Sequence, residues 1–431
     1  MSGTAQPASL HPTDDAPAVN WRPRLAPFAV PDAARAIGQL VMTAVPLAVS
    51  TAALLWGLSQ GFRPALLLAL PAAIFIVRLF IIQHDCGHGS FFRSGRANNL
   101  LGRMLGIVTM MPYGAWRRDH AVHHATCGNL ARRGIGDVTT LTVAEYRARS
   151  RWRRFTYRLY RHPFVLFVIG PAYVLLVRYR LPSASPLKER RGWLSILGTD
   201  AMAAAAGAGL ALLVGPLALI VGWGTTLLLA STIGVWFFYV QHQFEDTYWR
   251  PAGEWDFHAA ALEGSSFYDL PRVLHWLTGS IGFHHIHHLA SKIPSYRLRA
   301  CYDAVPELRC AKRVTLWSSL KSVRLSLWDE AAQKLVSFRQ AARVPALVKR
   351  SGARGVVVPR CETLTEFGRE PVGDRGNVDC GLGERKGPTP AALQRKMDRR
   401  LPERDRTELD GEEREPQDKE ADDRRDNHRK A

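Results

Sequence analysis

Four long apolar runs constrain the fold of this 431-residue chain more than any other feature of its sequence. The runs hold about 19–24 residues each and cover residues 37–59, 65–83, 193–214 and 217–240. A helix needs about 20 apolar residues to cross the ~30 Å hydrocarbon core of a bilayer, so each run has the length of a membrane span. We therefore expect an all-α integral membrane protein whose four transmembrane helices form two hairpins.

The distribution of positive charge predicts which side of the membrane the loops occupy. The net charge is +19, and from Pro345 onward 20 Lys and Arg stand against 19 Asp and Glu, so the excess lies before that residue. Residues 117–161 carry eleven arginines against three acidic residues, whereas the short connections at 60–64 and 215–216 contain only Arg63. Because cytoplasmic loops are enriched in Lys and Arg, the long basic loops are expected in the cytoplasm. Contact with anionic lipid headgroups is the simplest use of this positive charge, so we do not expect nucleic acid as a partner.

Two further apolar segments are not expected to cross the membrane. Residues 97–115 are interrupted by Gly, Arg and Pro, which favours a helix lying in the membrane interface. Residues 164–179 are short, contain Gly170-Pro171 and have basic flanks, so this segment should enter and leave on the same side. Arg78, near the inner end of the second run, is expected to extend to the interface.

Composition divides the chain into three parts. Residues 1–34 are predicted to be a disordered cytoplasmic arm, residues 35–344 the membrane domain, and residues 345–431 a disordered charged tail. Near the end of the membrane domain, residues 315–340 place Leu and Trp at helical spacing, which predicts an amphipathic helix.

Histidines gather in three short motifs and next to the end of one apolar run. The motifs read H-D-C-G-H, H-A-V-H-H and H-H-I-H-H, and their histidines at positions i, i+3 and i+4 share one face of a helix. One more histidine follows the fourth apolar run. The candidate metal ligands are His84, His88, His120, His123, His124, His242, His284, His287 and His288. His285, inside the third motif, is expected to support the site and not to bind metal.

The number of histidines indicates two metal ions. Imidazole suits zinc, copper, iron and nickel alike, so ligand type alone does not select the metal. A zinc site uses about three or four protein ligands, so eight or nine imidazoles exceed one site. A pair of irons held by many histidines can activate dioxygen. Ligating histidines usually donate their second N–H to a carboxylate, and the acidic residues beside the candidate ligands are Asp85, Asp119, Glu245 and Asp246.

The histidine motifs and their surroundings resemble the membrane fatty-acid desaturases, in particular the bacterial omega-6, or delta-12-type, acyl-lipid enzymes. The resemblance rests on HDCGH at 84–88, HAVHH at 120–124, VQHQFEDTYW at 240–249 and GFHHIHHLASKIPSYRLRAC at 282–301. It covers about residues 35–340 and implies four spanning helices under a cytoplasmic helical cap that holds a di-iron centre, with the nine histidines as ligands. Relatives often have Asn where this chain has Ser280.

The resemblance implies an O2-dependent enzyme that introduces a cis double bond into an acyl chain linked to a membrane lipid, to coenzyme A or to an acyl carrier protein. An unactivated C–H bond needs a metal-bound oxidant, because acid–base side chains cannot attack it. The sequence has no dinucleotide, flavin or haem motif, so a ferredoxin or cytochrome b5-like donor with its reductase is expected to supply electrons. The expected location is a bacterial inner membrane, with the active site on the cytoplasmic face.

Other interpretations of the same residues stay open. Trp236, Phe237, Phe238 and Tyr239 are expected either to line the acyl tunnel or to form an interfacial aromatic belt. The same histidine motifs support an acyl-chain hydroxylase or a carotenoid-modifying oxygenase. A zinc membrane hydrolase or a metal-handling protein is the alternative from a different class.

Overall fold

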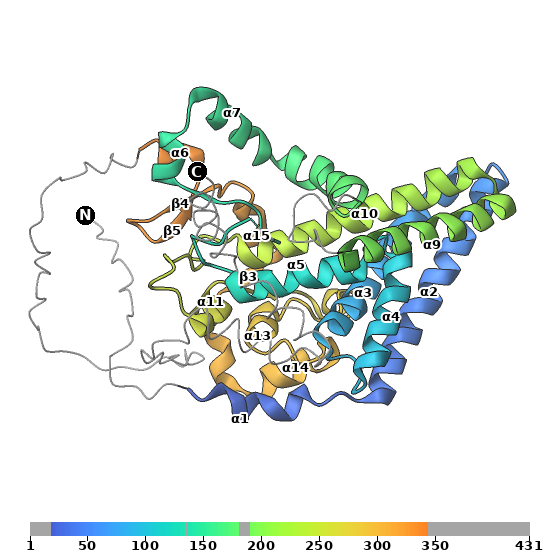
Figure 1. Ribbon diagram of the computed structural model, residues 1–431, viewed down its shortest axis with the longest axis horizontal. Helices are drawn as coiled ribbons and strands as arrows, with labels where there is room; N and C mark the ends of the chain where they lie inside the picture. The colour runs from blue at the N-terminus through green and yellow to red at the C-terminus, as the bar shows by residue number, and fades with distance from the viewer. Residues whose placement is uncertain (1–18, 135, 181–189, 344–431) are drawn as a thin grey trace, which may run out of the picture. The chain divides into compact units, whose positions relative to one another are not determined.

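Each of the four apolar runs forms a helix that is long and apolar enough to cross a membrane. The computed structural model describes residues 19–134, 136–180 and 190–343. The spans are α2 (Ala33–Ser59), η2 (Arg63–Leu68) continued by α3 (Ala69–His88), α9 (Arg190–Val214) and α10 (Pro216–His242). The prediction of four span-length helices in a mostly helical fold is confirmed (Figure 1).

Helix α3 lies at the centre of the helix bundle. It packs against α2 and α10 through small and branched side chains that are almost completely buried, among them Ala72, Ala73 and Ile76. Small residues let helix backbones approach closely where lipid provides no hydrophobic driving force between them. The buried packing of α3 fixes the position of its last turn, which carries His84 and His88.

Most of the shorter elements gather around the C-terminal ends of α3 and α10 (Figure 1). Before α2 lie α1 (Trp21–Leu25) and η1 (Ala26–Ala29). Between the two hairpins lie α4 (Gly95–Val108), α5 (Tyr113–Thr126), β1 (Leu141–Thr142), α6 (Val143–Ala148), α7 (Arg151–Tyr160), η3 (Val165–Ile169), α8 (Gly170–Tyr173) and η4 (Val174–Arg178). After α10 lie α11 (Phe257–Glu263), β2 (Phe267–Asp269), α12 (Arg272–Leu277), α13 (His284–Leu289), α14 (Ser295–Ala304), η5 (Pro306–Cys310), β3 (Arg313–Thr315), α15 (Leu316–Ser322), β4 (Leu327–Asp329), β5 (Lys334–Val336) and α16 (Phe338–Ala341).

The prediction of one amphipathic helix over residues 315–340 was wrong, because strands β4 and β5 of a small sheet interrupt this region. Only α15 is helical at the start of this region, and the chain then forms the antiparallel pair β4–β5. Strand β4 also pairs in parallel with β1, and β2 pairs with β3. Asp329 starts the turn between β4 and β5 by accepting backbone hydrogen bonds from Ala331 and Ala332. The strand pairing buries Trp328 completely, which outweighs the local helical pattern.

Part of the predicted N-terminal arm is ordered. Residues 1–18 lie outside the described part of the chain, but residues 21–29 form α1 and η1. Trp21 and Leu25 stand one helical turn apart and are buried in a cluster with Leu298 of α14. Two large apolar side chains on one face are enough to hold this short helix against the protein, so the expectation of disorder was wrong there.

Arg78 does not extend to the interface as predicted. Its side chain is only 2% exposed, and its Nε donates a hydrogen bond to Thr43 Oγ1 of α2 at 3.0 Å. It also pairs with Gln39, and its guanidinium lies 4.4 Å from the ring centre of Trp276 in α12. Arg78 therefore ties α2, α3 and α12 together inside the protein, because a buried cation needs such partners.

The segment at 164–179 is helical and bent. It consists of the π-helical turns η3 and η4 on either side of α8, and it makes an angle of 58° with α7. Pro171 has no N–H to donate, which favours the wider turns around it. Just before the segment Arg161 donates to Gln243 at 2.9 Å, and at its end Arg178 pairs with Asp119 at 3.0 Å. Both ends of the segment therefore lie close to candidate metal ligands, because Gln243 follows His242 and Asp119 precedes His120 in the sequence.

Candidate metal centre

Four separate elements bring the candidate ligands together. His84 and His88 occupy the last turn of α3, which ends at Gly89 in the left-handed conformation with φ 62°. The second motif lies on α5, the third forms most of α13, and His242 is the last residue of α10. The i, i+4 spacing within a helix turns each set of rings to one side. The nine histidines fall into two groups, each with ring nitrogens within 4.8 Å of one another.

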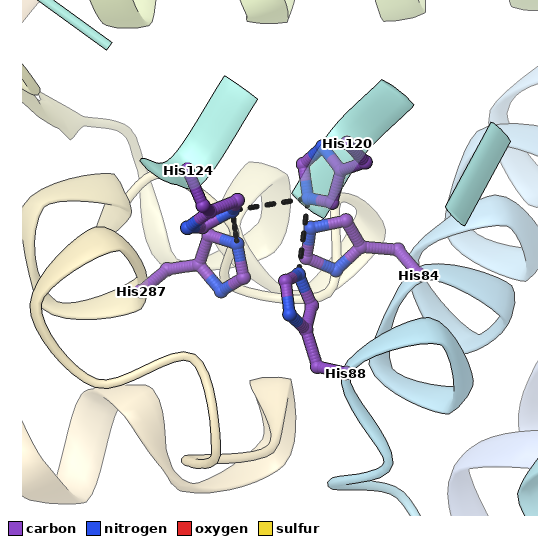
Figure 2. A group of neighbouring side chains, drawn as sticks. All are labelled: His84, His88, His120, His124 and His287. Atoms are coloured by element: carbon purple, nitrogen blue, oxygen red, sulfur yellow. Dashed lines mark hydrogen bonds between the residues drawn. The ribbon is translucent and has the colours of Figure 1, made fainter. Parts of the chain in front are cut away.

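The first group contains five histidines, which Figure 2 shows pointing toward a common centre: His84, His88, His120, His124 and His287. The Nε2 atom of His120 lies 3.0 Å from that of His88 and 3.1 Å from that of His124. The Nε2 atoms of His124 and His287 are 3.0 Å apart. Three helices, α3, α5 and α13, therefore contribute to one group.

The second group contains four buried histidines: His123, His242, His284 and His288. The Nε2 atom of His242 lies 3.2 Å from that of His123 and 3.0 Å from that of His284. The Nε2 atoms of His284 and His288 are 3.1 Å apart. The two groups adjoin each other, because the rings of His124 and His288 stack with centres 4.1 Å apart.

The spacing of the ring nitrogens fits metal coordination. Nitrogens bound to one metal at about 2.1 Å stand roughly 3.0–3.4 Å apart at adjacent corners of the coordination shell. The Nε2 separations of 3.0–3.2 Å in both groups agree with this range. Nine convergent imidazoles in groups of five and four have the donor chemistry for two metal ions and exceed what one ion can use.

Burial keeps the imidazoles in the form that binds metal. Burial lowers the pKa of five histidines on α5 and α13 well below the usual value, and the neighbouring rings lower the pKa further. These histidines are His120, His124, His284, His287 and His288. A histidine with a lowered pKa is neutral at physiological pH, and neutral imidazole is the ligand form. Burial also lowers the pKa of His285 to about 3, although this ring belongs to neither group.

The acidic residues predicted to orient the histidines divide into two pairs. Asp85 is buried, accepts the backbone N–H of Ser295 at 2.7 Å and lies 3.5 Å from His84 Nδ1. Asp119 is buried and pairs with Arg178. Glu245 and Asp246 are instead exposed and form surface ion pairs with Lys334 and Lys312, respectively. Adjacency to His242 therefore did not bring these two carboxylates to the ring.

Two contacts to the second group could not be read from the sequence. Asp137 Oδ1 lies 2.5 Å from His123 Nδ1, and the carbonyl oxygen of Gly264 lies 3.0 Å from His242 Nδ1. Asp137 stands 14 residues after His123 and Gly264 stands 22 residues after His242, and neither lies on the helix of its histidine. The folded chain brings them there, so no spacing rule signals them. Each contact fixes one ring nitrogen and leaves the other facing the group.

The aromatic residues at the end of α10 point in different directions. Trp236 and Tyr239 pack against Phe167, and Phe237 packs against Tyr268. Phe238 instead contacts the second group, with its ring centre 5.2 Å from that of His123 and 5.3 Å from that of His242.

Of the aromatic residues at the end of α10, Phe238 is therefore the one beside the candidate metal centre. The helical period explains this, because Phe238 stands four residues before His242 on the same face.

Ser280 adopts a left-handed backbone conformation with φ 58° in the turn before α13. Its N–H donates to the carbonyl of His275 at 2.7 Å, and its own carbonyl accepts from Phe283 N–H at 3.2 Å. Asn adopts this conformation more readily than Ser. An Asn at this position would therefore suit the same turn.

The span-length helices and the two histidine groups define a membrane protein with the donor set for two metal ions. The chain matches the family model described as fatty acid desaturase over residues 60–320, which includes all nine histidines. It is 41% identical over 331 residues to a protein of Bacillus subtilis named fatty acid desaturase, covering 75% of this chain and 91% of that protein. The chain belongs to the fatty acid desaturase family, whose members are oxidoreductases.

More distant relatives have more specific names. The chain is 28% identical over 228 residues to the sn-1 oleoyl-lipid 12-desaturase of Synechocystis sp., covering 53% of this chain and 64% of that protein. It is 29% identical over 242 residues to the sn-1 acyl-lipid omega-3 desaturase (ferredoxin) of the same organism, covering 53% and 63%. The resemblance drawn from the histidine motifs is confirmed at the level of the family.

Proposed function

We propose that this chain is an O2-dependent desaturase that introduces a cis double bond into the acyl chain of a membrane lipid, with two iron ions held by the nine histidines. The observation that carries the proposal is the convergence of these histidines into groups of five and four. The Synechocystis relatives, by their names, act on acyl lipids, which supports a lipid-linked chain as the substrate over a thioester of coenzyme A or acyl carrier protein.

The chemistry is divided between the metals and the protein. When bound, the two iron ions would supply the oxidising power for the removal of two vicinal hydrogens from the acyl chain. These two hydrogens, two electrons from a donor and two protons reduce one dioxygen to two water molecules. The histidines hold the metals as neutral ligands, and Asp137 and Gly264 fix the rings of His123 and His242. The burial of the second group keeps bulk water away from its rings.

An external donor supplies the electrons under this proposal. The name of one relative includes ferredoxin, which supports a ferredoxin for this chain, and a cytochrome b5-like protein is the other class of donor that fits. Either would act with a reductase. The enzyme is proposed to lie in a bacterial inner membrane with its metals on the cytoplasmic face, because the long Arg-rich loops adjoin the histidines.

Lipid analysis tests the proposed reaction. The chain is expressed in a host that has no such desaturase but supplies an electron donor, and its lipids are measured by mass spectrometry. Acyl chains lacking two hydrogens are expected, together with about two iron ions per purified chain. Acyl chains that gain an oxygen atom would instead identify a hydroxylase, and modified carotenoids would identify a carotenoid oxygenase. A single zinc per chain would contradict an oxygenase.

Replacing Asp137 by asparagine should weaken the metal centre. Asn keeps the shape but removes the negative charge beside His123 Nδ1, so the ring loses the partner that orients it and strengthens it as a ligand. We expect metal affinity or turnover to fall by about 10–100-fold, measured as iron retained against a chelator and as product formed. Asp246→Asn is the matched control, because that carboxylate is exposed and pairs with Lys312. Equal iron retention in both variants would contradict the role of Asp137.

Truncation after Val344 should leave turnover largely unchanged. The removed residues mix acidic and basic side chains in nearly equal number, and they lie beyond the family match that ends at residue 320. The measurement compares product formed per inserted chain in the full-length and truncated proteins. A truncated protein that inserts normally and makes no product would assign a function to the tail.

A further inference from the structure

A polar hollow lies where the first residues of α2 and α4 meet α14. It encloses about 650 Å³ and is lined by residues that include Asp32, Arg93, Ser94 and Arg297. Figure 1 shows the N-terminal ends of α2 and α4 close to α14. The hollow lies outside both histidine groups, although Arg93 follows the last turn of α3 and Arg297 follows α13.

The charges around the hollow favour an anion. Arg297 and Arg93 line it, and its acidic residue, Asp32, is already engaged with two arginines at 3.7 Å (Arg35) and 3.8 Å (Arg297). Arg93 is exposed, and its Nε donates a long hydrogen bond of 3.4 Å to the carbonyl of Pro31. The first turns of the 27-residue α2 and the 14-residue α4 are capped by Asp32 and Ser94, and the dipoles of the two helices add positive potential there. Two guanidinium groups in such a place match the oxygens of a phosphate.

The surfaces that leave the hollow are apolar and face outward. On α2 an exposed stripe begins one turn after the hollow and contains Ile37, Val41 and Val45, each more than half exposed. On α4 a second stripe contains Leu100 and Met104, which are 64% and 56% exposed. These stripes follow the i, i+4 spacing of one helix face, so they have the character of lipid-contacting surfaces. A lipid whose anionic headgroup lies in the hollow could therefore place its acyl chains along these two stripes.

We propose that this hollow binds the phosphate of a membrane phospholipid. Its arginines hold the headgroup at the end of α2, and the apolar stripes of α2 and α4 receive the acyl chains. Because Arg93 follows the end of α3 that carries His84 and His88, the headgroup is held at the same end of α3 as the first histidine group. That the bound lipid is the substrate rests on the proposed function, whereas the binding of its phosphate does not.

Lipid binding by the full-length protein tests the site without turnover. The probe is pyrene-labelled phosphatidylglycerol in detergent micelles, and the competitors are unlabelled phosphatidylglycerol, a galactosyl diacylglycerol with the same acyl chains, and inorganic phosphate. The double variant Arg93→Gln/Arg297→Gln should bind the phospholipid about tenfold more weakly, with galactolipid binding unchanged. The matched control is Arg63→Gln, an exposed arginine at the opposite end of α2 and α3.

Two outcomes would overturn the site. Equal phospholipid affinity in the wild type and the double variant would remove the role of the arginines. Displacement of the probe by inorganic phosphate as effectively as by phosphatidylglycerol would identify a site for free phosphate and not for a lipid. Arg297 also pairs with Asp32, so its replacement could disturb the fold. The single variant Arg93→Gln avoids this, and we expect it to lower the affinity for the phospholipid about threefold.

Turnover separates this site from the proposed function. With phosphatidylglycerol as substrate, the double variant should raise KM about tenfold and leave kcat unchanged, because the arginines are remote from the reacting carbons. Arginine-dependent lipid binding by a protein that desaturates nothing would support the headgroup site and contradict the proposed reaction. Desaturation with the same KM in both proteins would overturn the headgroup site and support the reaction.

Discussion

Replacing His123 or His287 by alanine is expected to abolish turnover while the chain still inserts into the membrane. Each variant removes one imidazole from a different group, His123 from the second and His287 from the first. Loss of a residue that only orients a ligand costs about 10–100-fold, so loss of a ligand should exceed about 100-fold. The measurements are product formed per inserted chain and iron bound per chain.

A histidine of the same chain outside both groups provides the control. His258 is exposed on α11, and His258→Ala should keep both iron and turnover at wild-type values. Insertion of the His123 and His287 variants should be normal, because the spans are held by apolar packing around α3 and not by the metals. Wild-type product in either variant would show that the histidine removed is not a ligand.

The features predicted well from the sequence are those that depend on local periodicity. The four spans follow from continuous apolar runs, because helix length and bilayer thickness are fixed quantities. The histidine motifs follow the helical period, so His120 and His124 face the same way once α5 forms. The helical period also places Phe238 on the same face of α10 as His242, because the two are four residues apart. Of the four consecutive aromatic residues, the period therefore indicates Phe238 as the one beside the histidines.

The features missed are those that depend on which distant segments meet. Glu245 and Asp246 follow His242 closely in sequence, but the chain leaves α10 there and carries both to the surface. Asp137 reaches His123 from a loop, which no local pattern indicates. In the same way, β4 forms because Leu327 pairs with Leu141 of β1, nearly two hundred positions earlier in the sequence. Such contacts are set by tertiary packing, which overrides local preference.

The histidine groups require one topology of the segment between the two hairpins. The bent segment from α7 to η4 is long and apolar enough to count as a fifth span, and a fifth span would separate α13 from α3 and α5 across the membrane. In the structure His287 and His124 are in contact. Arg161, at the bend between α7 and η3, lies beside Gln243, and Arg178, at the end of η4, lies beside Asp119. These contacts favour a segment that enters and leaves on the side of the histidines.

Single cysteines should test this topology with an all-or-none result. In a background with the native cysteines replaced, Ser150→Cys precedes α7, and Ser185→Cys lies before α9, outside the described residues. Both should resist a membrane-impermeant thiol reagent in intact cells and react after permeabilisation, because the basic loops that hold them are cytoplasmic. Ser59→Cys, exposed at the far end of α2, should react in intact cells and serves as the control. Labelling of only one of the first two in intact cells would place the histidines in different compartments, which a shared metal centre does not allow.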